Sequence, residues 1–232
     1  MKYIQFFFCV SLLVCIVACE KLDNYDEPAE TLTGKVIDQV TGEPLITEQP
    51  NGYRIKLSEI SWSENPEPEY FWGKADGTFN NTKLFAGTYE VSPVEGAFFD
   101  VSPQTVEIKG RVELEFKVIP YLSVATSGVE LKGGNTLEVI YTISRSQTGD
   151  KILDSRVFVS TNPNVGTNIL ITDLSPLNNL SETPDEVVLE TTYTEAITGL
   201  EKGQTYYVRV GARTDNPNKR YNFTPVTAVT IP

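Results

Sequence analysis

Histidine is absent from this chain of 232 residues, and cysteine, tryptophan and methionine are scarce. Without histidine the chain lacks the commonest general base, the usual metal ligand and the base of every Ser-His or Cys-His nucleophile pair. The composition therefore argues against most hydrolases and against metal centres. We expect no catalytic residue, no metal site and no cofactor.

The cysteines are Cys9, Cys15 and Cys19, all close to the N-terminus. Cys9 and Cys15 fall in an apolar segment that we expect to be cleaved, so the mature chain keeps Cys19 alone. A single cysteine allows no disulfide within one chain and no cysteine-rich zinc site.

Positive charge is also in short supply, since 19 Lys and Arg oppose 31 Asp and Glu for a formal net charge of -12. Nucleic-acid binding requires clustered Lys and Arg to neutralise phosphates, so this balance argues against nucleic acid. It argues equally against electrostatic adsorption to anionic lipid headgroups. The apolar fraction of 40% is typical of a folded protein.

Residues 1–18 have the pattern of a secretory leader. Lys2 is followed by an almost unbroken apolar run over residues 4–17, and small Ala18 precedes Cys19. This order resembles the bacterial lipobox, which implies that Cys19 becomes the lipidated N-terminus and anchors the protein to a membrane. The alternatives are an ordinary signal peptide or an N-terminal transmembrane helix, although the run is shorter than the roughly 20 residues that span a bilayer.

Residues 19–31 are acidic, are interrupted by Pro28 and lack apolar periodicity. We interpret them as a tether between the lipidated cysteine and the folded part. The acidic residues after Cys19 resemble the export signal that carries Bacteroidetes lipoproteins to the outer face of the outer membrane. The alternative is a solvated linker whose charge has no role.

From residue 32 onward the chain alternates short strand patterns with turns. Residues 32–38 predict an edge strand, and apolar residues then recur with a period of two between Val106 and Val118. This period predicts strands with one buried face. Lys109 and Gly110 interrupt the pattern and predict a turn there.

The first of these segments carry a family resemblance. Its motif consists of three short groups of residues: Gly34, Val36, Asp38, Thr41, Gly42 and Pro44; Asp76, Gly77 and Phe79; and Leu84, Gly87, Tyr89 and Val91. Residues 32–120 thereby resemble a carboxypeptidase-regulatory-like domain, a transthyretin-like β-sandwich. The resemblance implies a fold and no peptidase activity. Gly42 and Gly77 suit turn positions with positive φ.

Residues 121–232 predict a second sandwich. The segment 197–212 resembles the late strands of a fibronectin type III or immunoglobulin-like domain, in which Tyr206 holds the place of the corner tyrosine. Alternation places Val208 and Val210 inward and Tyr207 and Arg209 outward. We also expect a strand at residues 187–190 and a long loop over residues 162–185, in which a short helical turn near Leu177 is an alternative.

The sequence as a whole predicts an all-β protein of two β-sandwich domains. A lipobox followed by this pair of domains resembles a Bacteroidetes outer-membrane lipoprotein family of unknown function. That family is associated with starch-utilisation-type systems for glycan import. The resemblance implies an outer-membrane location facing the cell exterior. It also implies a polysaccharide or oligosaccharide ligand, and an outer-membrane transporter or glycan-binding lipoproteins as partners.

Carboxylates are the first candidates for chemistry. A glycosidase needs two acids facing each other across a cleft. Glu64, Glu67 and Glu69 cluster in one segment, but Pro66 and Pro68 predict an extended, exposed loop. Burial, which raises the pKa of a catalytic acid, is not expected in such a loop. We interpret it as a solvated acidic loop.

Aromatic residues are the stronger candidates. Trp62, Tyr70, Phe71 and Trp72 lie in one short segment that holds both tryptophans of the chain. Flat rings stack on the apolar faces of sugars, and loops on a rigid sandwich commonly carry binding residues. The competing interpretation is that these rings pack across paired strands or in the core.

Two function classes follow. The first is a non-catalytic surface lipoprotein that binds or presents glycan for a polysaccharide uptake system. The second is a structural or protein-interaction module, a spacer or subunit of an outer-membrane complex. An enzyme ranks third, because the carboxylates lack a catalytic arrangement.

Overall fold

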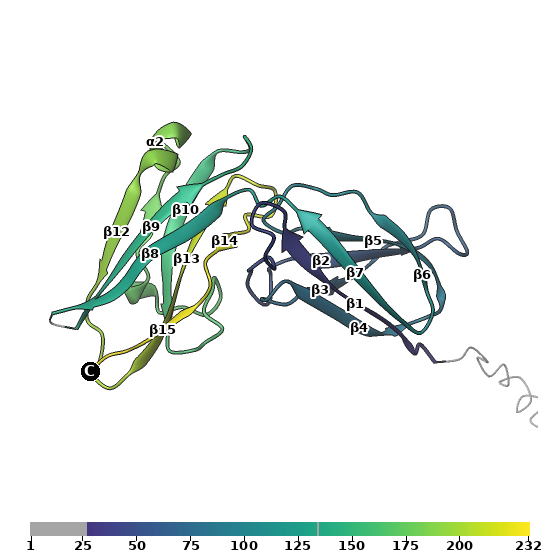
Figure 1. The fold of residues 1–232 in the computed structure, drawn as a ribbon, viewed down its shortest axis with the longest axis horizontal. Coiled ribbons are helices and arrows are strands. Elements are labelled where there is room, and N and C mark those ends of the chain that lie inside the picture. The colour runs from purple at the N-terminus through teal and green to yellow at the C-terminus, as the bar shows by residue number, and fades with distance from the viewer. Residues whose placement is uncertain (1–26, 134) are drawn as a thin grey trace, which may run out of the picture.

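The computed structural model describes residues 27–133 and 135–232, which form two β-sandwich domains joined end to end (Figure 1). The expectation of an all-β, two-domain protein is confirmed. The predicted leader of residues 1–18 and the lipidation site Cys19 lie outside the described residues, as does most of the predicted tether. The first strand begins at Glu30.

The N-terminal domain packs a three-stranded sheet, ordered β4-β1-β7, against a four-stranded sheet, ordered β3-β2-β5-β6. The strands are β1 (Glu30–Asp38), β2 (Arg54–Glu59), β3 (Glu69–Trp72), β4 (Thr78–Leu84), β5 (Gly87–Val94), β6 (Gln104–Ile108) and β7 (Arg111–Val118). The period-two pattern is confirmed, with Gly110 at a φ of 72° in the turn between β6 and β7. The apolar faces bury residues such as Leu32, Ile55 and Phe79.

Strand β1 is central in its sheet, so the prediction of an edge strand at residues 32–38 is wrong. It pairs antiparallel with β4 and parallel with β7. The strand that opens a domain often lies at an edge. Here the parallel partner comes about 80 residues later in the chain, and no local pattern announces that pairing.

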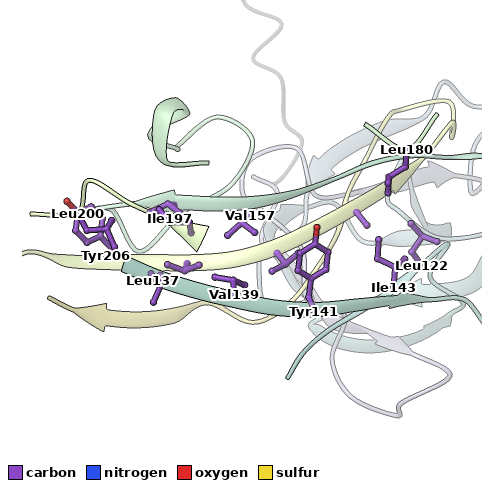
Figure 2. Close-up of a cluster of buried hydrophobic side chains, with 14 of the residues drawn as sticks. Leu122, Leu137, Val139, Tyr141, Ile143, Val157, Leu180, Ile197, Leu200 and Tyr206 are labelled. Carbon is purple, nitrogen blue, oxygen red and sulfur yellow. The ribbon is translucent and has the colours of Figure 1, made fainter. Parts of the chain in front are cut away.

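The C-terminal domain packs a three-stranded sheet, ordered β12-β9-β8, against a five-stranded sheet built on β10 and β13. Its elements are β8 (Ser123–Lys132), β9 (Thr136–Ser144), β10 (Ile152–Ser160), η2 (Thr172–Leu174), β11 (Leu177–Asn179), α2 (Asp185–Glu190), β12 (Thr192–Ile197), β13 (Thr205–Thr214), β14 (Asn222–Phe223) and β15 (Thr227–Thr230). Their inward side chains form one apolar core (Figure 2).

The corner tyrosine is confirmed. The Tyr206 hydroxyl accepts a hydrogen bond from the backbone N–H of Glu201 at 3.1 Å. Tyr206 lies beside Leu200 at one end of the core (Figure 2). The bond fixes the turn before β13, as the resemblance to fibronectin type III domains implies.

Two local predictions in this domain are wrong. Residues 187–190 belong to the short helix α2, not to a strand. Pro184 precedes the helix, and Asp185 and Glu186 occupy its first turn, where negative charge is favoured. The segment expected to be a long loop has its helical turn at η2, just before Leu177, but Leu177 itself begins strand β11, which pairs with β10.

Arg209 lies on the outward face of β13, as alternation predicts, but this face does not meet solvent. Its side chain is only 3% exposed and lies against the N-terminal domain. It donates hydrogen bonds to the backbone oxygens of Thr47 at 2.9 Å and Val165 at 3.3 Å, with its guanidinium 3.7 Å from the Phe223 ring centroid. The face of β13 that points away from its own sandwich is therefore buried against the N-terminal domain.

Further hydrogen bonds join the two domains. Glu48 accepts hydrogen bonds from Thr167, and the Asn222 side chain donates to the backbone oxygen of Ala97 at 2.8 Å. The Asn222 amide oxygen also accepts from the N–H of Leu122 at 3.0 Å. These buried contacts hold the domains in one relative orientation.

Candidate functional site

The most exposed large apolar side chain of the described residues belongs to Trp62, which is 85% exposed. Trp62 lies in the loop between β2 and β3, at the end of the N-terminal domain farther from the C-terminal domain (Figure 1). The start of the loop is fixed, because Ile60 N–H donates to Thr88 O and Thr88 N–H donates to Ser61 Oγ, at 2.8 and 2.7 Å. The indole is thus presented on a positioned segment.

A cleft of about 310 Å³ opens beside Trp62, between the ends of the two sheets. Such a volume lies at the lower end of small-ligand sites. The lining combines apolar groups, carboxylates and a lysine: Leu57, Glu59, Trp62, Ser63, Pro66, Glu67, Glu69, Lys83, Leu84, Phe85 and Tyr89. Polar and apolar groups contribute almost equally, which suits a ligand that carries many polar groups on a flat apolar face.

Glu59 brings an unsatisfied acceptor to the cleft. Its Oε1 atom is buried and has no hydrogen-bond partner within the part of the chain that the structure describes. A buried acceptor left unpaired costs about 1–3 kcal/mol. A ligand hydroxyl could reach this oxygen if the side chain turned toward the cleft, and the resulting hydrogen bond would remove that cost.

Tyr89 lies beside the same carboxylates. Burial, together with the nearby charges of Glu59 and Glu69, raises the pKa of Tyr89 to about 12. The phenol therefore stays protonated near neutral pH, and its O–H donates to the backbone oxygen of Phe85 at 3.1 Å. This bond ties the β4–β5 turn, which carries the half-exposed ring of Phe85, to the floor of the cleft.

The predicted aromatic residues do not form a single platform. Tyr70 and Trp72 lie on the outer face of the four-stranded sheet and are 42% and 41% exposed. Phe71, between them, points inward and packs on Phe79 with ring centroids 6.2 Å apart. Phe71 is thus a core residue, and Trp62 alone of the four lines the cleft.

Two arginines accompany the outer-face rings. The Arg54 guanidinium lies 4.3 Å from the Tyr70 ring centroid and 5.8 Å from that of Trp72. Arg220, from the C-terminal domain, lies 5.8 Å from the Trp72 centroid. Arg54 also forms an ion pair with Glu95. Tyr70 and Trp72 therefore already have cationic partners, whereas Trp62 has no such partner among the described residues.

Reasoning from the sequence missed Glu59, Lys83 and Phe85, which complete the cleft. The sequence could have indicated Phe85, because a large apolar residue in the turn before Gly87 is expected to be exposed. Glu59 and Lys83 carried none. They come to the cleft only because β2 and β4 end at the same end of the sandwich.

The cleft also lies beside the point where the chain enters the domain. Glu30, the first residue of β1, pairs with Leu84 of the cleft lining. Among the described residues, no cluster of three or more His, Cys, Asp or Glu side chains is arranged to hold a metal ion. No helix in the described ranges combines the length and the apolar character needed to cross a membrane.

Comparison with known families identifies both domains. Residues 30–119 match the family described as "Protein of unknown function (DUF3823) N-terminal domain". Residues 124–228 match "Domain of unknown function (DUF3823_C)". The chain belongs to the two-domain DUF3823 family. No curated protein matches it.

Solved structures of similar proteins share the whole architecture. A DUF3823 family protein from Bacteroides uniformis is 27% identical, with a TM-score of 0.78, over 88% of this chain and 100% of that chain. A second Bacteroides uniformis protein, named a "putative carbohydrate binding protein", is 25% identical with a TM-score of 0.71 over the same shares. A DUF3823 family protein from Parabacteroides merdae, 21% identical with a TM-score of 0.71 over the same shares, has the same fold.

Proposed function

We propose that this DUF3823 protein is a non-catalytic carbohydrate-binding protein and that the sugar binds in the cleft beside Trp62. The observation that carries the proposal is the exposure of Trp62 on a fixed loop at the rim of that cleft. Burying a large apolar side chain stabilises by about 1.5–3 kcal/mol. Trp62 is exposed, so the free protein does not gain this free energy. A sugar ring stacked on the indole would realise part of it.

The polar groups of the cleft favour an uncharged sugar. Glu59, Glu67 and Glu69 are acceptors for hydroxyl groups, and Lys83 is a donor. Three carboxylates against one ammonium would repel uronic acids and sulfated sugars. Support from a relative comes from the Bacteroides uniformis protein named for carbohydrate binding.

The absence of catalysis is part of the proposal. Glu64, Glu67 and Glu69 are exposed to solvent on the loop and strand at the rim. A glycosidase needs one acid held in apolar surroundings opposite a second one. Glu59 has the burial at one oxygen atom but lies near the open end of the sandwich, and we assign it to hydroxyl binding.

Calorimetry tests the proposal on the purified protein with neutral and uronate-containing polysaccharides. We expect binding to a neutral glycan that weakens at least tenfold in Trp62→Ala and in Glu59→Gln. Leu177→Ala, which removes an exposed apolar side chain from the other domain, serves as the matched control and should bind like the wild type. The proposal would be overturned if none of the glycans tested bound. If Trp72→Ala were the only substitution that abolished binding, the site would instead be on the outer face of the sheet.

Location and partners are proposed from the leader. We propose that Cys19 carries acyl chains, that the protein faces the exterior of the outer membrane, and that it assists a polysaccharide uptake system with a transporter and glycan-binding lipoproteins as partners. Several acyl chains, at about 0.8 kcal/mol per buried methylene, form a stable anchor. Mass spectrometry of the native protein should find acylation at Cys19, and Cys19→Ala should release the protein from the membrane fraction. An unacylated N-terminus would contradict this part.

The domain junction favours a second candidate, a rigid spacer within an outer-membrane complex. Buried hydrogen bonds from Arg209 and Asn222 fix the angle between the domains. Fixed geometry is of use to a protein that separates two partners. This candidate would be favoured over the first if the protein co-purified with an outer-membrane transporter but bound no glycan.

A further inference from the structure

Strand β3 is the free edge of the four-stranded sheet, since it pairs with β2 and with no other strand of the described residues. Gly73 N–H donates to Tyr53 O at 3.0 Å, and Phe71 stands opposite Ile55 two residues earlier. In an antiparallel pair alternate residues bond to the same neighbour. Residues 70 and 72 therefore direct their backbone N–H and C=O groups away from β2, toward the open edge.

An open edge is a template for pairing with another strand. Within the described chain, no backbone hydrogen bond reaches the outward groups of Tyr70 or Trp72. Edge strands are commonly blunted by a central proline or a covering loop. In this chain Pro68 lies just outside the strand, and residues 69–72 stay open.

The side chains above this edge suit a protein partner. Tyr70 and Trp72 stand on the outer face, half-exposed, with Arg54 beside both rings and Arg220 beside Trp72. Tryptophan, tyrosine and arginine are the residues that most often dominate the energy of protein interfaces. Arg220 comes from the C-terminal domain, so both domains contribute to the surface.

The local charge is positive although the chain as a whole is acidic. Arg54 is paired with Glu95. Lys56 lies opposite Tyr70 on the same face, and neither it nor Arg220 forms an ion pair within the described residues. Glu90 of β5 lies on the same face, opposite Ser58. The two cations without an ion pair, Lys56 and Arg220, outnumber this acid and favour a partner with negative charge.

A second copy of the chain suits the edge less well than an acidic segment. Two β3 strands paired antiparallel would continue one sheet, with both outer faces on the same side. Arg54 and Lys56 lie on β2, so the two groups of cations would face each other across two β3 strands, about 14 Å apart. Repulsion at that distance is weak, but such a pair also supplies no negative charge to these cations. The charge pattern therefore favours an acidic segment over a second copy of the chain.

We propose that β3 binds an acidic, extended peptide segment of another protein as an added strand. The backbone of the segment pairs with residues 70 and 72. Its outward side chains, which alternate along the strand, contact Tyr70 and Trp72 and place carboxylates near Arg220 and Lys56. This surface is separate from the cleft beside Trp62, and the inference goes beyond carbohydrate binding.

Selection from a display library of random nine-residue peptides on the purified protein tests the proposal. We expect enriched peptides with acidic residues at alternate positions. Arg220→Glu should weaken binding of the best synthetic peptide at least tenfold, whereas Lys202→Glu, a reversal on an exposed turn of the same domain, should leave it unchanged. Trp62→Ala should also leave it unchanged, which separates this site from the cleft.

Backbone pairing has its own readout. Methylation of alternate backbone nitrogens of the peptide should abolish binding in one register and spare it in the other. Tyr70→Pro removes an outward donor without touching the β2–β3 bonds, and it should abolish binding while circular dichroism stays unchanged. An absence of enriched peptides, a preference for basic ones, tolerance of methylation in both registers, or competition by a glycan would each overturn the proposal.

Discussion

Glu48 of the N-terminal domain accepts hydrogen bonds from both the backbone N–H and the hydroxyl of Thr167 in the C-terminal domain, at 2.8 and 2.8–2.9 Å. The carboxylate is 6% exposed. Burial raises the pKa of Glu48 above its ordinary value of 4.5, against the bonds from Thr167 and the charges of Arg209 and Arg220, which lower it. The junction therefore contains an acid that is costly to ionise.

This pKa sets a pH dependence of stability. Because the folded pKa of Glu48 is raised, its contribution is complete below pH 4.5 and is lost as the pH rises through the folded pKa. We expect Glu48→Gln to remove this loss, so that the free energy of unfolding of the variant gains on the wild type from pH 4.5 upward. Urea denaturation across pH 4–8 measures it. Parallel curves for the two proteins would contradict the assignment.

Asp185 should show the opposite sign. Burial alone raises the pKa of Asp185, but hydrogen bonds from Lys151 and Arg145 more than offset this, so the pKa lies below 3.8. The stability it provides is present above pH 3.8 and is lost as the pH falls through the folded pKa. Asp185→Asn should cost about 2 kcal/mol at pH 7, with the difference shrinking in acid. Glu186→Gln, an exposed neighbour on α2, is the control and should cost little at any pH.

Deleting one oxygen atom, the Tyr206 hydroxyl, removes the corner hydrogen bond. Tyr206→Phe deletes the acceptor of the Glu201 N–H, and we expect a loss of about 1 kcal/mol in the free energy of unfolding. Tyr207→Phe removes a hydroxyl that has no hydrogen-bond partner among the described residues, and it should change stability by less. Equal losses from both substitutions would show that the corner bond is not special.

Gly34 tests the packing of β1 between its two neighbours. A Cβ atom at this position would lie 2.1 Å from the backbone oxygen of Leu114 and 2.5 Å from the Phe79 ring. We expect Gly34→Ala to destabilise the protein by about 3 kcal/mol, because β1 is held on both sides and cannot move away. Gly128→Ala in β8, where the nearest atom is 3.8 Å away, should be nearly neutral. Thermal unfolding distinguishes the two.

Features carried by local sequence were predictable. The period-two pattern of β6 and β7, the turn at Gly110 and the corner residue Tyr206 each depend on residues within a few positions of one another. The two-domain β fold followed from such features because each has one common structural solution. The helix at residues 185–190 was missed because its valines favour a strand, while Pro184 and the acids at its start favour a helix.

Features that depend on distant contacts were not predictable. Alternation placed Arg209 on the far side of β13 from the core, which is correct, but it carries no information on what covers that side. The same holds for the aromatic segment. The one-residue offset between Glu69 and Tyr70 sends one side chain toward the cleft and the other to the opposite face of the sheet, and the assignment of faces required the register with β2.

The pairing of Glu30 with Leu84 fixes where a captured sugar would sit along the length of the protein. If the chain is anchored at Cys19, the 11 peptide units to Glu30 span at most about 40 Å. The cleft lies at the end of the domain where this segment enters. The second sandwich would then lie farther from the membrane. A bound sugar would be held on the membrane side of the protein, close to a transporter in the bilayer, and not at the outer tip of the molecule.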